Sequence, residues 1–219
     1  MNMNDLRLDY FIRQDLKLYQ HKEHFHFNTD TRLLANFLKV NDQETVLDIG
    51  TNNGALLLWV DQFEVKKLYG VEVLKEAYDI ARLNADIFFQ HEHEIIHAPI
   101  QEVNVESVDV IISNPPFFTQ KETHPNVKMD MRQLGRIEIN LTLDELIKHA
   151  NRLLKSNGRF YFVHRPTRMQ EILTTLNQYS FGAKRIAFAY DKDHECKSIL
   201  IEAIKERRCN CQILPPIEI

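Results

Sequence analysis

The alternation of short apolar runs with helical segments between residues 45 and 113 most constrains the fold of this chain. Apolar runs of strand length occupy residues 45–47, 67–71, 94–97 and 108–113, and segments of helical period occupy residues 55–60 and 74–89. Alternating strands and helices produce a parallel sheet, because the chain must cross back over the sheet before the next strand begins. The sequence therefore predicts an α/β fold.

The C-terminal half continues this alternation. Thr142 and Glu145 match a capping box that opens a helix ending at residues 156–158, and a strand follows at residues 159–164. Thr167 and Gln170 match a second capping box, for a helix to residue 179. Two strands near residues 185–190 and 197–205 are close enough to pair as a hairpin, which reverses one of them. We expect a Rossmann-like, seven-stranded, mostly parallel sheet with one antiparallel strand and helices on both faces.

The N-terminal residues precede the first predicted strand. A helix with one apolar face is expected at residues 30–38, where Thr29 or Asp30 is placed to cap it. The chain contains no internal repeat or Gly/Ser-rich linker, so residues 42–219 are expected to form one compact unit. Residues 1–41 are expected to form an extension that packs on the ligand site of that unit.

Composition excludes several classes of protein. No stretch approaches the roughly 18 uninterrupted apolar residues of a membrane span. The N-terminus carries Asp5 and Asp9 where a signal peptide is basic and then apolar, so we expect a cytoplasmic protein. The three cysteines, Cys196, Cys209 and Cys211, have no C-x-x-C spacing. This pattern argues against a disulfide framework or a zinc site, and we expect no bound metal.

The two halves of the chain differ in charge. Residues 1–120 hold 10 Lys and Arg against 19 Asp and Glu, whereas residues 121–219 hold 17 against 12. The formal net charge of −4 hides this difference. A basic C-terminal half is able to meet the phosphates of a nucleic acid, and a solvated surface with a local excess of cations is the alternative.

The first candidate site follows the first predicted strand. Residues 46–54 read V-L-D-I-G-T-N-N-G and lie where a strand gives way to a helix, the place at which open α/β sheets bind ligands. Gly50 allows a tight turn, and Gly54 allows the helix to start close to the strand. Glu72 closes the next strand, where its carboxylate is able to accept hydrogen bonds from both hydroxyls of a ribose. The pattern predicts a cofactor that contains a nucleoside.

That cofactor is not expected to be a dinucleotide. The fingerprint G-x-G-x-x-G is absent, because Asn52 and Asn53 stand where its phosphate-approaching glycines would be. Taken alone, Gly50 and Gly54 could belong to an ordinary strand-to-helix turn with no ligand. Glu72 at the end of the next strand favours the functional interpretation.

The second candidate site is the stretch I-I-S-N-P-P-F-F at residues 111–118. The Asn114 side-chain oxygen and the Pro115 carbonyl offer two acceptors for the two N–H groups of an exocyclic amine on a nucleobase. Such acceptors favour a pyramidal nitrogen whose lone pair is available to attack an electrophile. Proline stiffens the backbone, and Phe117 is able to stack on a flipped-out base. The alternative is that Pro115 and Pro116 only stop the strand while the phenylalanines fill the core.

The loop that begins at Asp48 reads D-x-G-x-x-x-G and resembles motif I of the S-adenosylmethionine methyltransferases. Together with N-P-P-F, the segments at residues 19–20, 25–27, 30–35, 46–56, 136–138, 164–166 and 214–216 resemble the bacterial tRNA(Val)-specific adenine N6-methyltransferases. The resemblance runs from about Leu6 to the C-terminus. It implies a class I methyltransferase fold and methylation of the N6 amine of the anticodon-loop adenine just 3′ of the anticodon, position 37.

The resemblance also implies a set of functional residues. S-adenosyl-L-methionine is the implied cofactor, with contacts at Asp30, Asp48, Gly50, Thr51, Asn52, Gly54, Glu72, Val73, Ala98 and Asn114. The implied catalytic residues are Asn114, Pro115, Pro116 and Phe117. The chain departs from the family at Asn52, where glycine is common, and at Ala98, where an acid is common and would bind the adenine amine of the cofactor. Asparagine tolerates the left-handed conformation better than most residues.

RNA is expected to meet the long connection at residues 119–141, since connections of that length in a compact domain are usually functional or disordered. It carries Lys121, Lys128, Arg132 and Arg136, and Arg165 and Arg168 are expected to extend the same surface. The expected partner is the anticodon stem-loop of a tRNA. The protein is expected to be a monomer or weak dimer and to have no membrane as a partner.

Two other functions remain open on the sequence. Asn114 and Pro115 would serve equally for methylation of a guanine N2 amine or a protein glutamine N5 amide, because N-P-P-F is shared with enzymes of those kinds. The second alternative belongs to a different class of function. In it the chain is a tRNA-binding module with weak or lost activity, a hypothesis motivated by Asn52 and Ala98.

Overall fold

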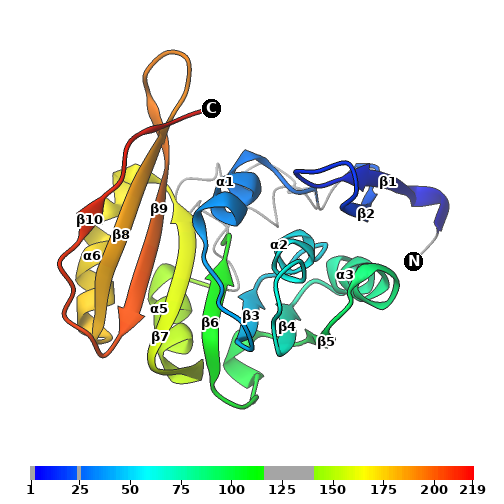
Figure 1. Cartoon of the computed structure of the whole chain (residues 1–219), viewed down its shortest axis with the longest axis horizontal. Helices are drawn as coiled ribbons and strands as arrows, with labels where there is room; N and C mark the ends of the chain where they lie inside the picture. The colour runs from blue at the N-terminus through cyan, green and yellow to red at the C-terminus, as the bar shows by residue number, and fades with distance from the viewer. Residues whose placement is uncertain (1–2, 24–25, 116–140) are drawn as a thin grey trace, which may run out of the picture.

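The computed structural model describes residues 3–23, 26–115 and 141–219 (Figure 1). Its α-helices are α1 (Thr29–Phe37), α2 (Ala55–Val60), α3 (Lys75–Phe88), α5 (Leu143–Leu153) and α6 (Met169–Gln178), with short 3-10 helices η1 (Met3–Asp5), η2 (Ile100–Glu102) and η4 (Pro166–Arg168). Its strands are β1 (Leu6–Tyr10), β2 (Lys17–His21), β3 (Thr45–Ile49), β4 (Lys67–Glu72), β5 (Glu92–His97), β6 (Val108–Ser113), β7 (Leu154–His164), β8 (Phe181–Tyr190), β9 (Cys196–Lys205), β10 (Gln212–Ile213) and β11 (Ile217–Glu218).

Nine of the described strands form one sheet in the order β10-β8-β9-β7-β6-β3-β4-β5, with β11 also paired to β8. The seven strands β3 to β9 are those that the sequence predicts. β9 runs antiparallel to both β7 and β8, whereas β3 to β7 pair in parallel. The predicted fold, a mostly parallel α/β sheet with one reversed strand, is therefore confirmed, and the C-terminal tail adds two short strands along β8.

Helices cover both faces of the sheet because successive strand residues point to opposite sides. In β3, Val46 packs into a cluster with apolar residues of α1 and α2, and Leu47 packs into a second cluster with those of α5 and α6. Figure 1 shows α2 and α3 beside β3 to β5, and α6 along β8. Among the described residues, no helix combines the length and apolarity that crossing a bilayer requires.

Three predicted boundaries are wrong. The side chain that caps α1 belongs to Asn28, one residue before the predicted candidates, and it accepts a hydrogen bond from the Thr31 amide. Thr167 does not cap α6, because Pro166 opens a 3-10 turn and the helix starts only after Arg168. The segment at residues 156–158 lies within β7 and does not end α5.

The segment within β7 has its own reason to contain glycine. α5 ends at Leu153 and the chain enters β7 at once, with an irregular register against β6. Asn157 has φ 62°, and a Cβ on Gly158 would lie 2.8 Å from both Leu154 Cδ2 and the Lys155 carbonyl oxygen. Glycine therefore permits a close backbone approach inside a distorted strand.

The N-terminal residues form an antiparallel hairpin, β1 and β2, which the sequence analysis did not predict. The hairpin packs on α3, and Asn84 of that helix is fully buried beneath it. The Asn84 side chain accepts from the Tyr19 amide at 2.7 Å and donates to the carbonyls of Tyr19 and Asn53, each at 2.8 Å. One buried side chain thus joins the hairpin to the loop that follows β3.

Candidate cofactor and amine site

The register of three parallel strands brings the principal predicted residues to one level. Asp48 of β3 pairs with residues of β4 on one side and of β6 on the other. Two residues further along each strand come Gly50, Glu72 and Asn114. The Ser113 hydroxyl donates to the Ile49 carbonyl at 2.8 Å and joins the ends of β6 and β3. The turn, the acidic side chain and the amide of the prediction therefore lie side by side at the carboxyl edge of the sheet.

The loop after β3 is a tight turn held by β4. The amides of Gly50 and Thr51 both donate to the Val71 carbonyl, at 2.9 and 3.0 Å. Gly50 has φ 74°, Asn52 has φ 54° and Gly54 has φ 82°. Asn52 thus adopts the left-handed conformation that asparagine tolerates better than most residues. A Cβ on Gly50 would meet nothing within 4 Å among the described atoms, so this turn faces open space.

Glu72 holds the same loop from the neighbouring strand. Its Oε2 accepts from the Asn52 amide, and its Oε1 accepts from the amides of Val73 and Leu74, each at 2.9 Å. Burial raises the pKa of this carboxyl, and the three amide hydrogen bonds oppose the rise. A carboxylate oxygen accepts more than one hydrogen bond, so Glu72 retains capacity for the hydroxyls of a ribose.

The loop also contains buried polar atoms that form no hydrogen bond of good geometry with any described residue. They are both carboxylate oxygens of Asp48, the Thr51 hydroxyl and the Asn52 side-chain oxygen. Burial raises the pKa of Asp48 to about 7; the Thr51 hydroxyl moderates the rise and the charge of Glu72 adds to it. Buried polar groups normally have partners, so four such atoms in one turn indicate a polar ligand. The ammonium and hydroxyl groups of S-adenosylmethionine match these acceptors, and the residues present fit that cofactor.

Asn114 lies at the end of β6, half-buried, against the first turn of α1. Its side-chain nitrogen donates to the Thr31 hydroxyl at 3.0 Å and lies 3.5 Å from the Asn28 side-chain oxygen. The nitrogen of the amide is thereby engaged, and within the described residues the carbonyl oxygen is the end that remains for a ligand. Pro115, next along the chain, is buried.

Sequence reasoning missed three neighbours of the site. Asn28 and Thr31 contact Asn114 from α1, and the only signal for Asn28 was its fitness as a helix N-cap. His97 pairs with Glu72 across β4 and β5, donates to the Val73 carbonyl at 3.1 Å and stacks on the Tyr78 ring. His97 directly precedes Ala98, a predicted cofactor contact, and this position could have indicated that His97 lies near the site.

The remaining predicted cofactor residues lie around this core. Val73 is exposed beside Glu72, and Ala98 is partly buried at the end of β5. Asp30 faces a different element, because its buried carboxylate accepts a hydrogen bond from the Ser198 hydroxyl of β9. Most of the predicted cofactor residues therefore lie together at the carboxyl edge of the sheet. The Asp30 carboxylate is instead bound to Ser198 of β9, the reversed strand.

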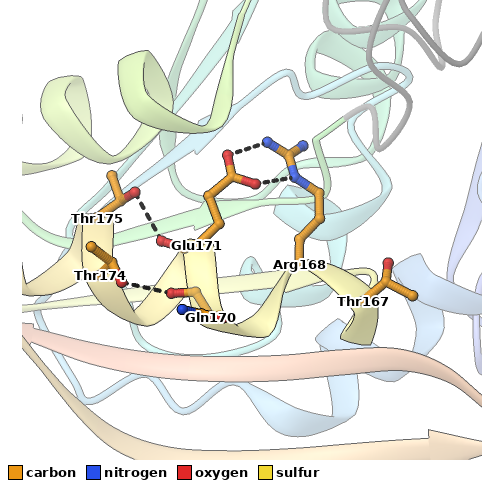
Figure 2. Close-up of a pocket in the computed structure, with 6 residues that line it drawn as sticks. All are labelled: Thr167, Arg168, Gln170, Glu171, Thr174 and Thr175. Atoms are coloured by element: carbon orange, nitrogen blue, oxygen red, sulfur yellow. Dashed lines mark hydrogen bonds and ion pairs between the residues drawn. The ribbon is translucent and has the colours of Figure 1, made fainter.

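The predicted RNA-binding cations fall into two groups. Lys121, Lys128, Arg132 and Arg136, like the predicted catalytic Pro116 and Phe117, lie outside the described residues. Arg165 donates to the Lys197 carbonyl at 2.8 Å, and Arg168 makes a bidentate ion pair with Glu171 beside an open pocket of about 440 Å³ (Figure 2). Arg168 is therefore neutralised within the protein, and it reaches a phosphate only by leaving Glu171 or sharing its guanidinium.

The fold and the site define a class I S-adenosylmethionine-dependent methyltransferase: the strand order places a glycine turn, an acidic strand end and Asn114 at one edge. The chain belongs to the methyltransferase small domain family, whose model matches residues 23–189. Solved structures share the fold. A predicted O-methyltransferase from Agrobacterium tumefaciens has a TM-score of 0.66 at 18% identity, covering 86% of both chains. Trm5 from Methanocaldococcus jannaschii, in complex with adenosine, has a TM-score of 0.69 at 13% identity, covering 93% of this chain and 56% of that one.

Similar curated proteins share one name, tRNA1(Val) (adenine(37)-N6)-methyltransferase. The protein from Dyadobacter fermentans is 27% identical over 191 residues, covering 80% of this chain and 78% of that protein. The protein from Porphyromonas gingivalis is 31% identical over 165 residues, covering 71% of this chain. That match spans 64% of the Porphyromonas protein, which is less than two thirds of its length.

Proposed function

We propose that this protein methylates the N6 amine of an adenine in a tRNA anticodon loop, the adenine that the names of its relatives number 37. The observation that carries the proposal is the Asn114 amide, which is held at the level of the Gly50 turn with its nitrogen engaged by Thr31. An acceptor at that place is suited to an amine that lies beside the cofactor. The names of the similar curated proteins support the choice of adenine over other amines.

The residues of the site divide the work of binding and positioning. S-adenosylmethionine, when bound, supplies a methyl group on a positively charged sulfur. Glu72 would hold the ribose hydroxyls of the cofactor, and Asp48 would accept from its ammonium group or from a water next to it. The Asn114 oxygen and the Pro115 carbonyl would accept the two N–H groups of adenine N6, which concentrates the nitrogen lone pair on the side facing the methyl group. No general base is needed to begin the reaction.

We also propose that residues 1–41 form an extension that completes the site. Gln20 of β2 accepts from the Asn53 side chain at 3.1 Å and from the Phe27 amide at 3.0 Å. The loop after β3 and the approach to α1 are thereby joined by one buried glutamine. tRNA is the proposed partner, and this partner would place the protein in the cytoplasm. The protein is proposed to act as a monomer or weak dimer, which light scattering would test.

The test supplies unmodified total tRNA and methyl-labelled S-adenosylmethionine, digests the RNA and identifies the labelled nucleoside. We expect N6-methyladenosine with the wild-type protein. Asn114→Ala is the matched control, expected to lose turnover while it binds the cofactor within about tenfold of wild type. Label in N2-methylguanosine, or in protein alone, would overturn the proposal. A folded protein that releases no heat with the cofactor in calorimetry would instead indicate a tRNA-binding module.

A further inference from the structure

The hydroxyl of Thr31 has all of its hydrogen-bonding capacity in use. A threonine hydroxyl offers one donor and two acceptor lone pairs. The Thr31 hydroxyl donates to the Asn28 side-chain oxygen at 3.0 Å. It accepts from the Asn28 amide at 3.2 Å and from the Asn114 side-chain nitrogen at 3.0 Å. With its hydrogen on Asn28, Thr31 receives a hydrogen bond from Asn114, and it would have to break its bond to Asn28 to give one.

The same contacts disfavour the opposite orientation of the Asn114 amide. If the amide rotated by half a turn, its oxygen would take the place of the nitrogen that now lies 3.5 Å from the Asn28 oxygen. Two carbonyl oxygens would then face each other, and the Thr31 lone pair would lose its donor. Asn28 is itself fixed, because its oxygen caps α1 through the Thr31 amide at 2.9 Å. The hydrogen-bonding groups of the α1 capping box therefore favour the orientation of Asn114 in which its side-chain nitrogen faces them.

We propose that Asn28 and Thr31 are positioning residues that select the orientation of the Asn114 amide in which its oxygen faces the amine to be methylated. The inference rests on the proposed role of Asn114 as an acceptor. In the rotated orientation Asn114 would present N–H groups to the N–H groups of the amine, and the amine would not bind productively. The first turn of α1 thus has a catalytic consequence beyond its contribution to helix stability.

Two variants of Thr31 test the inference. Thr31→Val keeps the shape of the side chain and removes the hydroxyl, so we expect kcat to fall roughly tenfold while the Kd for the cofactor stays within about twofold. Thr31→Ser keeps the hydroxyl and is expected to hold kcat within about twofold of wild type. Glu145→Ala is the matched control, because Glu145 occupies the same third helical position in the capping box of α5. It should lower the melting temperature while leaving kcat unchanged.

A second readout does not depend on turnover. In asparagine-labelled protein, the side-chain N–H protons of Asn114 are assigned by their loss in Asn114→Ala, and the proton donated to Thr31 should exchange with solvent more slowly than the other. Thr31→Val should speed the exchange of the donated proton toward that of the other, and Thr31→Ser should preserve its slow exchange. Should Thr31→Val fail to fold, two Asn114 N–H protons that both exchange as fast as those of an exposed asparagine in the wild-type protein would overturn the inference. So would a folded Thr31→Val variant with wild-type kcat.

Failure of the inference and failure of the proposed function give different results. A wild-type protein that methylates no adenine contradicts the proposed function, while the N–H protons of Asn114 still report the orientation of its amide. A wild-type protein that forms N6-methyladenosine, with Asn114→Ala inactive and Thr31→Val fully active, contradicts the positioning role alone.

Discussion

Asp48 is expected to destabilise the free protein and to be required when the cofactor binds, and Asp48→Asn separates these two effects. The side chain is almost wholly buried, and its oxygens receive no hydrogen bond of good geometry from any described residue, although the Thr51 hydroxyl lies close enough to moderate its pKa. Burial raises its pKa from 3.8 to about 7. The folded protein therefore keeps a proton on Asp48 that the unfolded chain has lost above about pH 4, so the free energy of unfolding falls as the pH rises toward 7.

The magnitude follows from the size of the shift. Each unit of pKa corresponds to about 1.4 kcal/mol, so the wild-type protein should lose about 2 to 3 kcal/mol relative to Asp48→Asn between pH 5 and pH 7.5. Urea unfolding of the free proteins at both pH values measures this difference. At pH 7.5 the variant should be the more stable protein. It should nevertheless bind S-adenosylmethionine about ten- to hundredfold more weakly in calorimetry, because it lacks the carboxylate that pairs with the ammonium group.

Asp109→Asn is the control for this experiment. Burial raises the pKa of Asp109, but hydrogen bonds from Lys155 and the Thr45 amide outweigh it and leave the pKa lowered. Its titration lies below pH 5, so its stability difference from wild type should not change between pH 5 and pH 7.5. A flat difference for Asp48→Asn over the same range, with unchanged cofactor affinity, would refute the assignment of Asp48 to the cofactor site.

Three further predictions concern the ribose contact, the N-terminal hairpin and the predicted RNA surface. Glu72→Gln should weaken cofactor binding about ten- to hundredfold in calorimetry, since an amide replaces one acceptor oxygen by a donor; affinity within twofold of wild type would exclude Glu72 from the ribose contact. Asn84→Ala should lower the free energy of unfolding in urea by about 2 to 4 kcal/mol by leaving buried backbone groups of Tyr19 and Asn53 unpaired, whereas the exposed Asn36→Ala should change it by less than about 0.5 kcal/mol. Arg132→Glu with Arg136→Glu should weaken tRNA binding and flatten its dependence on salt in filter binding, and an unchanged salt slope would remove that connection from the RNA surface.

The local pattern of apolar residues was sufficient to predict the central sheet. It was also sufficient to predict that the site residues lie side by side at the carboxyl ends of the strands. The period of the apolar residues changes at each boundary between residues 45 and 113, and parallel pairing then places Gly50, Glu72 and Asn114 together. The antiparallel strand followed from the short connection before it. These features depend on residues close in sequence or on the general rules of parallel sheets.

Features that depend on distant contacts were not predicted. The alternation of Leu6, Leu8 and Tyr10 is a strand signal, but pairing with β2 and packing on α3 decide whether such a short segment forms a strand. The contact between Thr31 and Asn114 joins residues 83 positions apart and requires α1 to lie over the end of β6. Asp30 shows the same limit, because its partner Ser198 belongs to a strand near the other end of the chain.

The most direct test of the proposed function compares two tRNA(Val) transcripts that differ at one base. One carries adenine at position 37 and the other carries guanine there, and both are given to the wild-type protein with methyl-labelled S-adenosylmethionine. We predict label in the first transcript, recovered as N6-methyladenosine at that position, and none in the second. Equal labelling of both transcripts, or labelling of the guanine transcript alone, would contradict the conclusion that Asn114 receives the N6 amine of that adenine.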